Sequence, residues 1–521
     1  MAPDRWENFL TTVTEEILRL GHESGIDSVH VGYAVVDILQ LFPEELLNIS
    51  FASNHIARLN QDIAQSLPTV FSILTNIARG ITDPEASTSA DIPEYVRQLG
   101  RDPAWRTRAW KAILKWLQYG IKDDKLFIPL VGMTIKQLQV LAAQQLGGST
   151  LPAESQVTDE EVEAATLVLD DMFSNESMAS RFGKTISTLV LEHYTQPWLI
   201  DAISRCAGEH DDHAVLQWCM PLISFGEVYM EPMINNITNS ALSRHIETYF
   251  QIMLDLTRFP GYYAFDEDIS GNSLEIWYLL QEAIVSYDPE TDDAETNAEK
   301  LEQTRQSVRS VFLQVLQALL VKAAYPPTDA WLDADKDDKA RFLSYQREVG
   351  ETLLTTYYVL RDEMLALLVD ETIAALSVFS LDNWQQLDVL LLALKYIGES
   401  VPDTEDTHLP RLFTVETLSQ RFLPLLQSNL DADTRTAQWG LISIKSSVLS
   451  LIGAYGEWWK SHPELLPIVV PCVTSSLNQH VLVAKAVVAF RSICDSCRDQ
   501  LAGAADSMVQ LAREVLLAGT T

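Results

Sequence analysis

The sequence predicts an all-α protein, a right-handed α-solenoid (superhelix) of HEAT-like antiparallel helix pairs. Helical hydrophobic spacing recurs from one end of the chain to the other, and short polar breaks separate helices of one to two dozen residues. No sustained period-two run bounded by turn residues occurs. HEAT hairpins recur about every 40–47 residues, so a chain of 521 residues has room for roughly 11–13 of them. We expect one continuous HEAT/ARM-type array over residues 1–521, with a large globular helical enzyme as the competing architecture.

The predicted helices share apolar residues three and four positions apart on one face. The third is expected to begin at Ser66 and Pro68, as a cap and a first-turn residue. The segments with this spacing lie at 9–20, 31–42, 66–81, 105–121, 182–194, 246–256, 274–287, 308–323, 345–368, 384–397, 442–459 and 482–494.

Four polar breaks are expected to be loops, at 82–93, 147–159, 287–302 and 400–410. The loop at 287–302 is strongly acidic and contains the candidate partner-binding residues Asp288, Glu290, Asp292, Asp293 and Glu295. One interpretation is a hydrated connection between two helices. The other is an electrostatic attraction for a basic partner, which raises the encounter rate more than the affinity.

The chain carries a net charge of -35, from 37 basic and 72 acidic side chains. Such a field repels nucleic acid phosphates and anionic lipid, so direct nucleic acid binding is disfavoured and basic partners are favoured. The charge can also serve only to keep a long surface soluble. The amino terminus has no signal-peptide pattern, and prolines interrupt the longest uncharged apolar stretch, 465–483. We therefore expect an intracellular protein that does not insert into membranes.

The sequence contains no recognisable catalytic or phosphate-binding motif, and we expect neither enzyme activity nor a cofactor or metal. A triad assembled in space would remain invisible at this stage. Cys494 and Cys497 have CxxC spacing but lie in a helical pattern, which favours packing over redox or zinc chemistry. His210 and His213 are expected in a solvated turn between helices.

The aromatic pair Trp277 and Tyr278 is expected to pack between helical hairpins rather than to form a binding platform. Both residues lie in the middle of the segment Leu274-Glu-Ile-Trp-Tyr-Leu-Leu-Gln-Glu282, which has helical spacing.

Six segments together resemble the importin-13 and transportin-SR branch of the importin-β superfamily, and the resemblance covers almost the whole chain. The most specific are Gly453-Ala-Tyr-Gly-Glu-Trp-Trp-Lys-Ser-His-Pro463, Pro260-Gly-Tyr-Tyr-Ala264 and Leu274–Glu282. The others are Leu39-Gln-Leu-Phe-Pro-Glu-Glu-Leu46, Ala112-Ile-Leu-Lys-Trp-Leu117 and Ile493-Cys-Asp-Ser-Cys-Arg498.

The resemblance implies a nuclear transport receptor built as a HEAT-repeat superhelix. Members of this family bind Ran in its GTP state, engage nucleoporins, and carry protein cargo, often basic, between cytoplasm and nucleus. The alternative is a HEAT-repeat scaffold that assembles a protein complex without transport. A Ran-GTP pulldown with the missing upstream repeats restored would best separate the two.

Family members are nearly twice as long, so the resemblance also implies that the N-terminal importin-β domain and the C-terminal repeats are missing. The first predicted helix carries Trp6, Phe9, Leu10, Val13 and Ile17 on one face, which a preceding helix would cover in a repeat array. We expect the 521-residue chain alone to expose this face and to bind Ran-GTP weakly or not at all.

Overall fold

The computed structural model describes residues 12, 36–44, 53–80, 94–120, 124–147, 157–288, 294–430 and 434–504. Over these ranges the chain is helical, and β pairing is limited to an isolated bridge between Tyr263 and Glu267. This confirms the predicted all-α helical repeat fold. The chain divides into two compact units, Met1–Ile252 and Met253–Thr521, with the division inside helix α12 (Ser243–Thr257). The single continuous array of roughly 11–13 hairpins stays a prediction.

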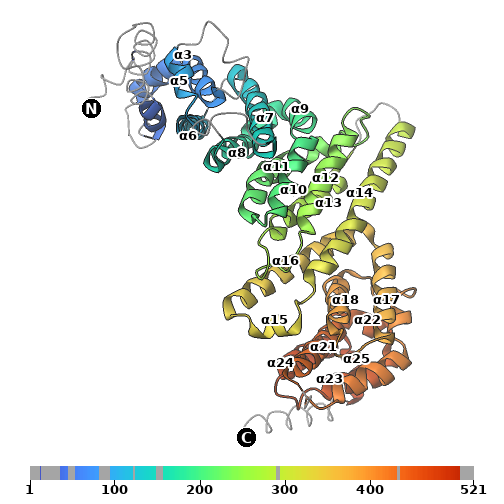
Figure 1. Cartoon of the computed structure of the whole chain (residues 1–521). Coiled ribbons are helices and arrows are strands. Elements are labelled where there is room, and N and C mark those ends of the chain that lie inside the picture. Colours follow the sequence, from blue (N-terminus) through green and yellow to red (C-terminus); the bar gives the residue numbers. More distant parts are fainter. Residues whose placement is uncertain are drawn as a thin grey trace. The chain divides into compact units, whose positions relative to one another are not determined.

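In the first unit, four helices pack one after another in the order α3, α6, α8 and α11 (Figure 1). Helices α7, α9 and α10 lie beside this series and pack against α8 and α11. The helices of this unit are α3 (Ser53–Arg79), α5 (Glu94–Leu99), α6 (Pro103–Gly120), α7 (Asp124–Gly147), α8 (Asp159–Phe173), α9 (Glu176–His193), α10 (Pro197–Gly208) and α11 (Asp212–Ile234).

In the second unit, the series is α13, α16, α18, α21 and α24, and each of these helices packs on the next. We call them the series helices of this unit. The helices are α13 (Leu274–Ser286), α14 (Ala294–Ala323), α15 (Thr328–Asp333), α16 (Lys336–Leu360), α17 (Asp362–Ser377), α18 (Trp384–Ile397), α19 (Leu409–Leu412), α20 (Leu423–Gln427), α21 (Arg435–Ala454), α22 (Gly456–Ser461), α23 (Leu466–Thr474), α24 (Val483–Ser496) and α25 (Arg498–Leu501).

Neighbouring series helices approach each other closely where one of them carries a glycine. A Cβ on Gly350 of α16 would lie 2.2 Å from the ring of Tyr396 on α18. A Cβ on Gly440 of α21 would lie 2.7 Å from the indole of Trp384, also on α18. Because any larger residue would collide with these rings, the two glycines set the spacing of the series helices.

A buried ion pair holds α6 to α8 in the first unit. The guanidinium of Arg106 donates from Nε and Nη2 to the two carboxylate oxygens of Glu161, each at 2.7 Å, and also from Nη1 to the carbonyl of Gly100. Both side chains are fully buried. Burial raises the pKa of Glu161, and the Arg106 charge opposes that rise. The fork of Arg106 therefore satisfies a carboxylate that could not remain charged alone.

An aspartate–serine hydrogen bond joins two successive helices in each unit, α8 to α11 in the first and α18 to α21 in the second. Ser224 of α11 donates to Oδ1 of Asp170 on α8 at 2.5 Å, and Ser447 of α21 donates to Oδ1 of Asp388 on α18 at 2.5 Å. Asp170 is half-buried, whereas Asp388 is 3% exposed. Burial raises the pKa of Asp388 to about 7, although the Ser447 hydroxyl lowers it.

Several helix boundaries differ from the predicted ones. The segment predicted at 442–459 is divided between α21 and α22 at Tyr455. The helix expected to begin at Ser66 is part of α3, which begins at Ser53 and contains Pro68 in its interior. The prediction was wrong because the amphipathic face runs through the proline, and packing against α6 and α7 offsets the lost hydrogen bond. The single segment at 345–368 is two helices, because Arg361 has a φ of 48° and ends α16.

One described helix contains a stretch, Lys125–Gln144 of α7, that is long and apolar enough by composition to cross a membrane. Half of that stretch is buried, and α7 packs against α8, α9 and α10. A core helix of a helical unit has the same composition, which makes this stretch weak support for a membrane span. The first predicted helix, with Trp6, Phe9, Leu10, Val13 and Ile17, lies outside the described residues.

Candidate functional site

The acidic segment predicted as a loop at 287–302 is helical over its second half. Helix α14 begins at Ala294, so Glu295 lies in its first turn and Glu299 one turn later. The loop prediction was wrong there because Ala294–Glu302 contains good helix formers, and carboxylates are favourable at a helix N-terminus. Asp288 is exposed just after α13, whereas Glu290, Asp292 and Asp293 lie outside the described residues. The role of these residues in partner binding stays a prediction.

A second acidic cluster was missed in the sequence. It runs from the first turn of α15 into the first turn of α16, and we call it the acidic rim: Asp329, Asp333, Asp335, Asp337 and Asp338. The first four side chains are exposed and the fifth is partly exposed. The sequence does show a concentration of acidic residues, because 333–338 reads Asp-Ala-Asp-Lys-Asp-Asp. Trp331 separates this stretch from Asp329. The five carboxylates lie within ten residues of one another, with the exposed Lys336 among them.

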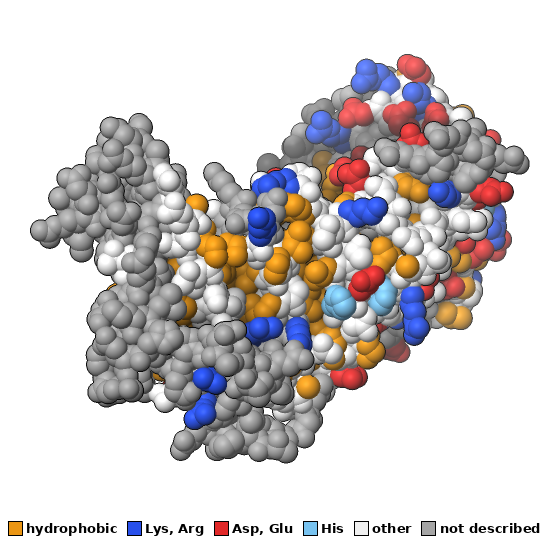
Figure 2. Space-filling model, turned by 90° about the horizontal axis from the view of Figure 1, so that it is seen from above, with side chains coloured by type: hydrophobic (Ala, Val, Ile, Leu, Met, Phe, Trp, Pro, Cys, Tyr) orange, Lys and Arg blue, Asp and Glu red, His pale blue; other side chains and the backbone are white. Residues whose placement is uncertain are grey.

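Acidic and basic side chains are interspersed on the face shown in Figure 2, and hydrophobic side chains gather in one area. Opposite charges that lie close together partly offset each other locally, so the net charge of -35 does not by itself show where a basic partner would be attracted. The acidic rim and Asp288 are candidate positions for that attraction.

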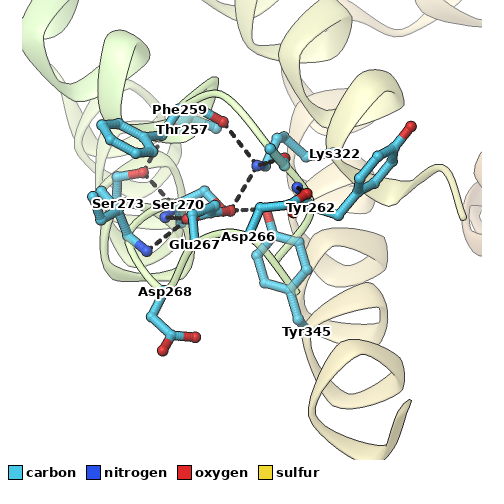
Figure 3. A network of polar contacts seen from close by, with 12 residues as sticks. Thr257, Phe259, Tyr262, Asp266, Glu267, Asp268, Ser270, Ser273, Lys322 and Tyr345 are labelled. Atoms are coloured by element: carbon cyan, nitrogen blue, oxygen red, sulfur yellow. Dashed lines mark hydrogen bonds and ion pairs between the residues drawn. The ribbon is translucent and has the colours of Figure 1, made fainter. Parts of the chain in front are cut away.

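A buried ion pair lies beneath the Pro260–Ala264 motif, as Figure 3 shows. Lys322, near the end of α14, donates to the carbonyls of Phe259 and Gly261 at 2.9 and 2.7 Å, and to Oε1 of Glu267 at 2.6 Å. These bonds use all three protons of the ammonium group. Burial lowers the pKa of Lys322, and Glu267 opposes that effect. The lysine thus ties the loop between α12 and α13 to α14.

The carboxylate of Glu267 is satisfied on its other sides by the turn that follows it. It accepts hydrogen bonds from the backbone N–H groups of Ile269 and Ser270 at 2.6 and 2.9 Å, and from the Ser270 hydroxyl at 2.6 Å. The hydroxyls of Ser270 and Tyr345 are 2.8 Å apart, which extends the network to α16 (Figure 3). The Tyr345 ring stacks on Tyr263 with centroids 4.2 Å apart. The motif therefore joins three helices through one polar core.

The Gly453–Pro463 motif forms a second brace. Tyr455 donates to the carbonyl of Leu394 on α18 at 3.0 Å, and the indole of Trp458 donates to the carbonyl of Glu405 at 2.8 Å. The rings of Tyr455 and Trp458 both pack on Phe413, with centroids 5.4 Å away. These contacts hold the connection after α18 against α22.

The aromatic pair of α13 divides between core and surface. Trp277 is fully buried, and its indole donates to the Thr257 hydroxyl at 2.9 Å, in agreement with its predicted core role. Tyr278 is 42% exposed and donates to Glu282. Its predicted burial was wrong, because successive helical residues point about 100° apart and only one of the two can face the core.

The cysteine candidates are packed and His210 lies in a turn, as predicted. His213 is exposed in the first turn of α11, so its predicted place in the turn was wrong. Cys497 is buried and Cys494 is half-buried, and both thiols are free. Burial raises the pKa of Cys497 to about 11, which keeps its reactive thiolate scarce at neutral pH. His210 is exposed between α10 and α11 with a φ of 57°. Across the described residues, no three metal-ligating side chains come together.

Comparisons with known proteins cover almost the whole chain, including both braces. A family model described as the Transportin-3/Importin-13 third TPR domain matches residues 434–511. Importin-13 of Mus musculus is 24% identical over 526 residues, which cover 99% of this chain and 46% of that protein. Importin-13 of Homo sapiens is 23% identical with the same coverage.

The chain is homologous to importin-13. A solved structure described as importin13 in the cytosolic state gives a TM-score of 0.69 at 18% identity, covering 98% of this chain and 54% of that one. Importin beta-like protein kap111 of Schizosaccharomyces pombe is 24% identical over 314 residues, or 59% of this chain and 28% of that protein. This chain spans about half the length of the importin-13 relatives.

The motifs that resemble importin-13 family sequences lie at internal contacts of this chain. Two of the three most specific motifs take part in the braces: Gly261 accepts a hydrogen bond from Lys322, and Trp458 donates one to Glu405. The family model's description names a TPR domain, whereas the sequence predicted the HEAT type; both repeats are antiparallel helix pairs. The polar groups of these two braces are therefore already engaged within the chain.

Proposed function

We propose that this chain acts in an importin-β-type nuclear transport receptor that binds protein cargo and carries it between cytoplasm and nucleus. It works by reversible protein binding, without catalysis and without a cofactor. Ran-GTP controls cargo binding, nucleoporins are further partners, and the receptor shuttles between nucleus and cytoplasm. The observation that carries the proposal is the importin-13 homology over 99% of the chain.

The charge distribution supports a basic cargo. The chain has a net charge of -35, and the acidic rim lies exposed on described helices. Asp288 and the predicted contacts Glu290, Asp292, Asp293 and Glu295 add a second acidic stretch. Attraction between exposed charges acts over about 8 Å at physiological ionic strength, so it speeds encounter and weakens as salt rises.

The first experiment restores the upstream repeats that the sequence predicts to be missing. It then measures binding of the extended chain to Ran loaded with a non-hydrolysable GTP analogue and to Ran loaded with GDP. Tighter binding to the GTP form supports a transport receptor. Equal binding to both forms, or none, contradicts the nucleotide control and favours a repeat scaffold that assembles a protein complex.

The second experiment measures the association rate of a reporter carrying a lysine- and arginine-rich segment over a salt series. Replacing Asp329, Asp333 and Asp337 with asparagine should slow association with little effect on dissociation. The same rate measurement tests the second acidic stretch, with amide replacements of Asp288, Glu290, Asp292 and Asp293. An association rate that does not depend on salt would contradict the steering role of both.

A matched control removes the same charge elsewhere. Asp201, Glu231 and Glu247 are exposed residues of the first unit, and their amide variants also remove three negative charges. A rate reduced as strongly by this control as by the rim variant would show that net charge alone, and not the rim, attracts the partner.

A further inference from the structure

Helix α15 is a short insertion in the connection between α14 and α16, and it reaches beyond its own helix pair. In an ordinary repeat array, each repeat contacts only its neighbours. Helix α15 packs against α21, although α18 lies between α16 and α21 in the series (Figure 1). The contact therefore bypasses one series helix.

Trp331 is the centre of this contact and is 3% exposed. Its ring lies 5.6 Å from Phe342 of α16 and 6.1 Å from Trp439 of α21, between centroids. It lies 6.0 Å from Phe265, in the loop before α13, and 4.9 Å from Tyr325 in its own connection. One indole thus joins side chains that belong to three positions of the series.

Thr328, at the start of α15, binds the helix that Trp331 bypasses. Its hydroxyl accepts hydrogen bonds from the indole of Trp384 at 3.0 Å and from the side-chain amide of Gln385 at 3.2 Å, both at the start of α18. Tyr325 packs on the Trp384 ring at 5.4 Å. Trp384 in turn lies against Gly440 of α21. The N-terminal ends of α16, α18 and α21 therefore meet along α15.

The insertion is itself held in place by the start of α16. The ammonium group of Lys339 donates to the carbonyls of Leu332 and Ala334 at 3.1 and 2.6 Å, which are the free carbonyls at the end of α15. Asp335 caps α16 by accepting from the N–H groups of Asp337 and Asp338, each at 2.8 Å. Helix α15 is therefore anchored at its end and cannot detach without losing these bonds.

We propose that α15 is a strap that couples α16, α18 and α21 into one rigid block of the second unit. Bending of a helical repeat array is the sum of small rotations between neighbours. A strap across three series helices restricts two of those rotations at once, so the three helices open together. The inference rests on these contacts and does not depend on the proposed transport function.

Hydrogen–deuterium exchange on the full 521-residue chain tests the strap. Trp331→Ala should raise exchange by about tenfold or more in the first turns of α16, α18 and α21, because local opening governs exchange. Trp277→Ala is the matched control. Trp277 is also a buried tryptophan, but its ring contacts Phe312 of α14 and its indole donates to Thr257 of α12. Its effect should centre on α12, α13 and α14 and leave exchange in the first turns of α18 and α21 unchanged.

Thr328→Val provides a second variant that keeps the tryptophan core if Trp331→Ala fails to fold. It removes the acceptor of two α18 side chains, whereas the ring contact with α21 is made by Trp331. Faster exchange in α21 as well as α18 is expected, because the strap transmits the loosening. Changes confined to α15 and α16 in the tryptophan variant, or to α18 in the threonine variant, would overturn the proposal. A Trp277→Ala profile that matches that of Trp331→Ala would also overturn it.

Discussion

Replacing Asp388 with asparagine is expected to stabilise the second unit at neutral and alkaline pH. Asp388 is 3% exposed, between α18 and α21, and the Ser447 hydroxyl donates to its Oδ1 at 2.5 Å. An asparagine keeps an acceptor oxygen for that hydroxyl. It also removes the need to hold a charge in a buried place, where ionisation is costly.

The magnitude follows from the raised pKa of Asp388, which is about 7 in the folded chain against the ordinary value of 3.8. The folded state then binds more protons than the unfolded state between these two values. The free energy of unfolding therefore falls as pH rises through this window and levels off above about 7. A difference of about 3 pKa units corresponds to about 4 kcal/mol at most.

The assay is urea unfolding of the wild type and the variant between pH 5.5 and 8.5, followed by the exchange protection of α18. Subtracting the two curves removes the pH dependence that they share. The advantage of Asp388→Asn should grow up to about pH 7 and then stay constant. Asp170→Asn is the control, because Asp170 accepts the same kind of serine hydrogen bond but is half-buried. A difference that does not change with pH would refute the reasoning.

Three further substitutions test the buried contacts of the second unit. Lys322→Met leaves Glu267 buried without its cation and should cost about 3–5 kcal/mol in urea unfolding, whereas adding Glu267→Gln should restore part of the loss. Burial lowers the pKa of Lys445 to about 8, so the unfolded state binds more protons above that pH. The contribution of this lysine should therefore rise from about pH 8 to about pH 10, and Lys445→Met should remove the slope. Gly350→Ala should cost about 1–3 kcal/mol, measured by thermal unfolding, because its Cβ meets the Tyr396 ring; an unchanged midpoint would show that the ring moves aside freely.

The candidate site was predictable only in part. The charge of Asp288 and its neighbours is visible in the sequence, but Glu295 lies in a helix that the loop prediction overlooked. The acidic rim went unnoticed because Trp331 and α15 separate its members, and only the fold shows that they are exposed together. Exposure depends on which face a helix buries, and Tyr278 shows that a residue beside a core tryptophan can face solvent.

The sequence by itself determined the all-α class, the approximate place of most helices and the kinship of its motifs. Helical spacing is local, since residues three and four apart share a face, and it needs no knowledge of the rest of the chain. The structure alone decided what the motif side chains do. Lys322 meets Glu267 across 55 positions, Trp458 meets Glu405 across 53, and Trp331 reaches Trp439 over a bypassed helix. These contacts join residues that are distant in the sequence. They depend on how neighbouring repeats pack, and the local pattern that forms each helix does not determine that packing.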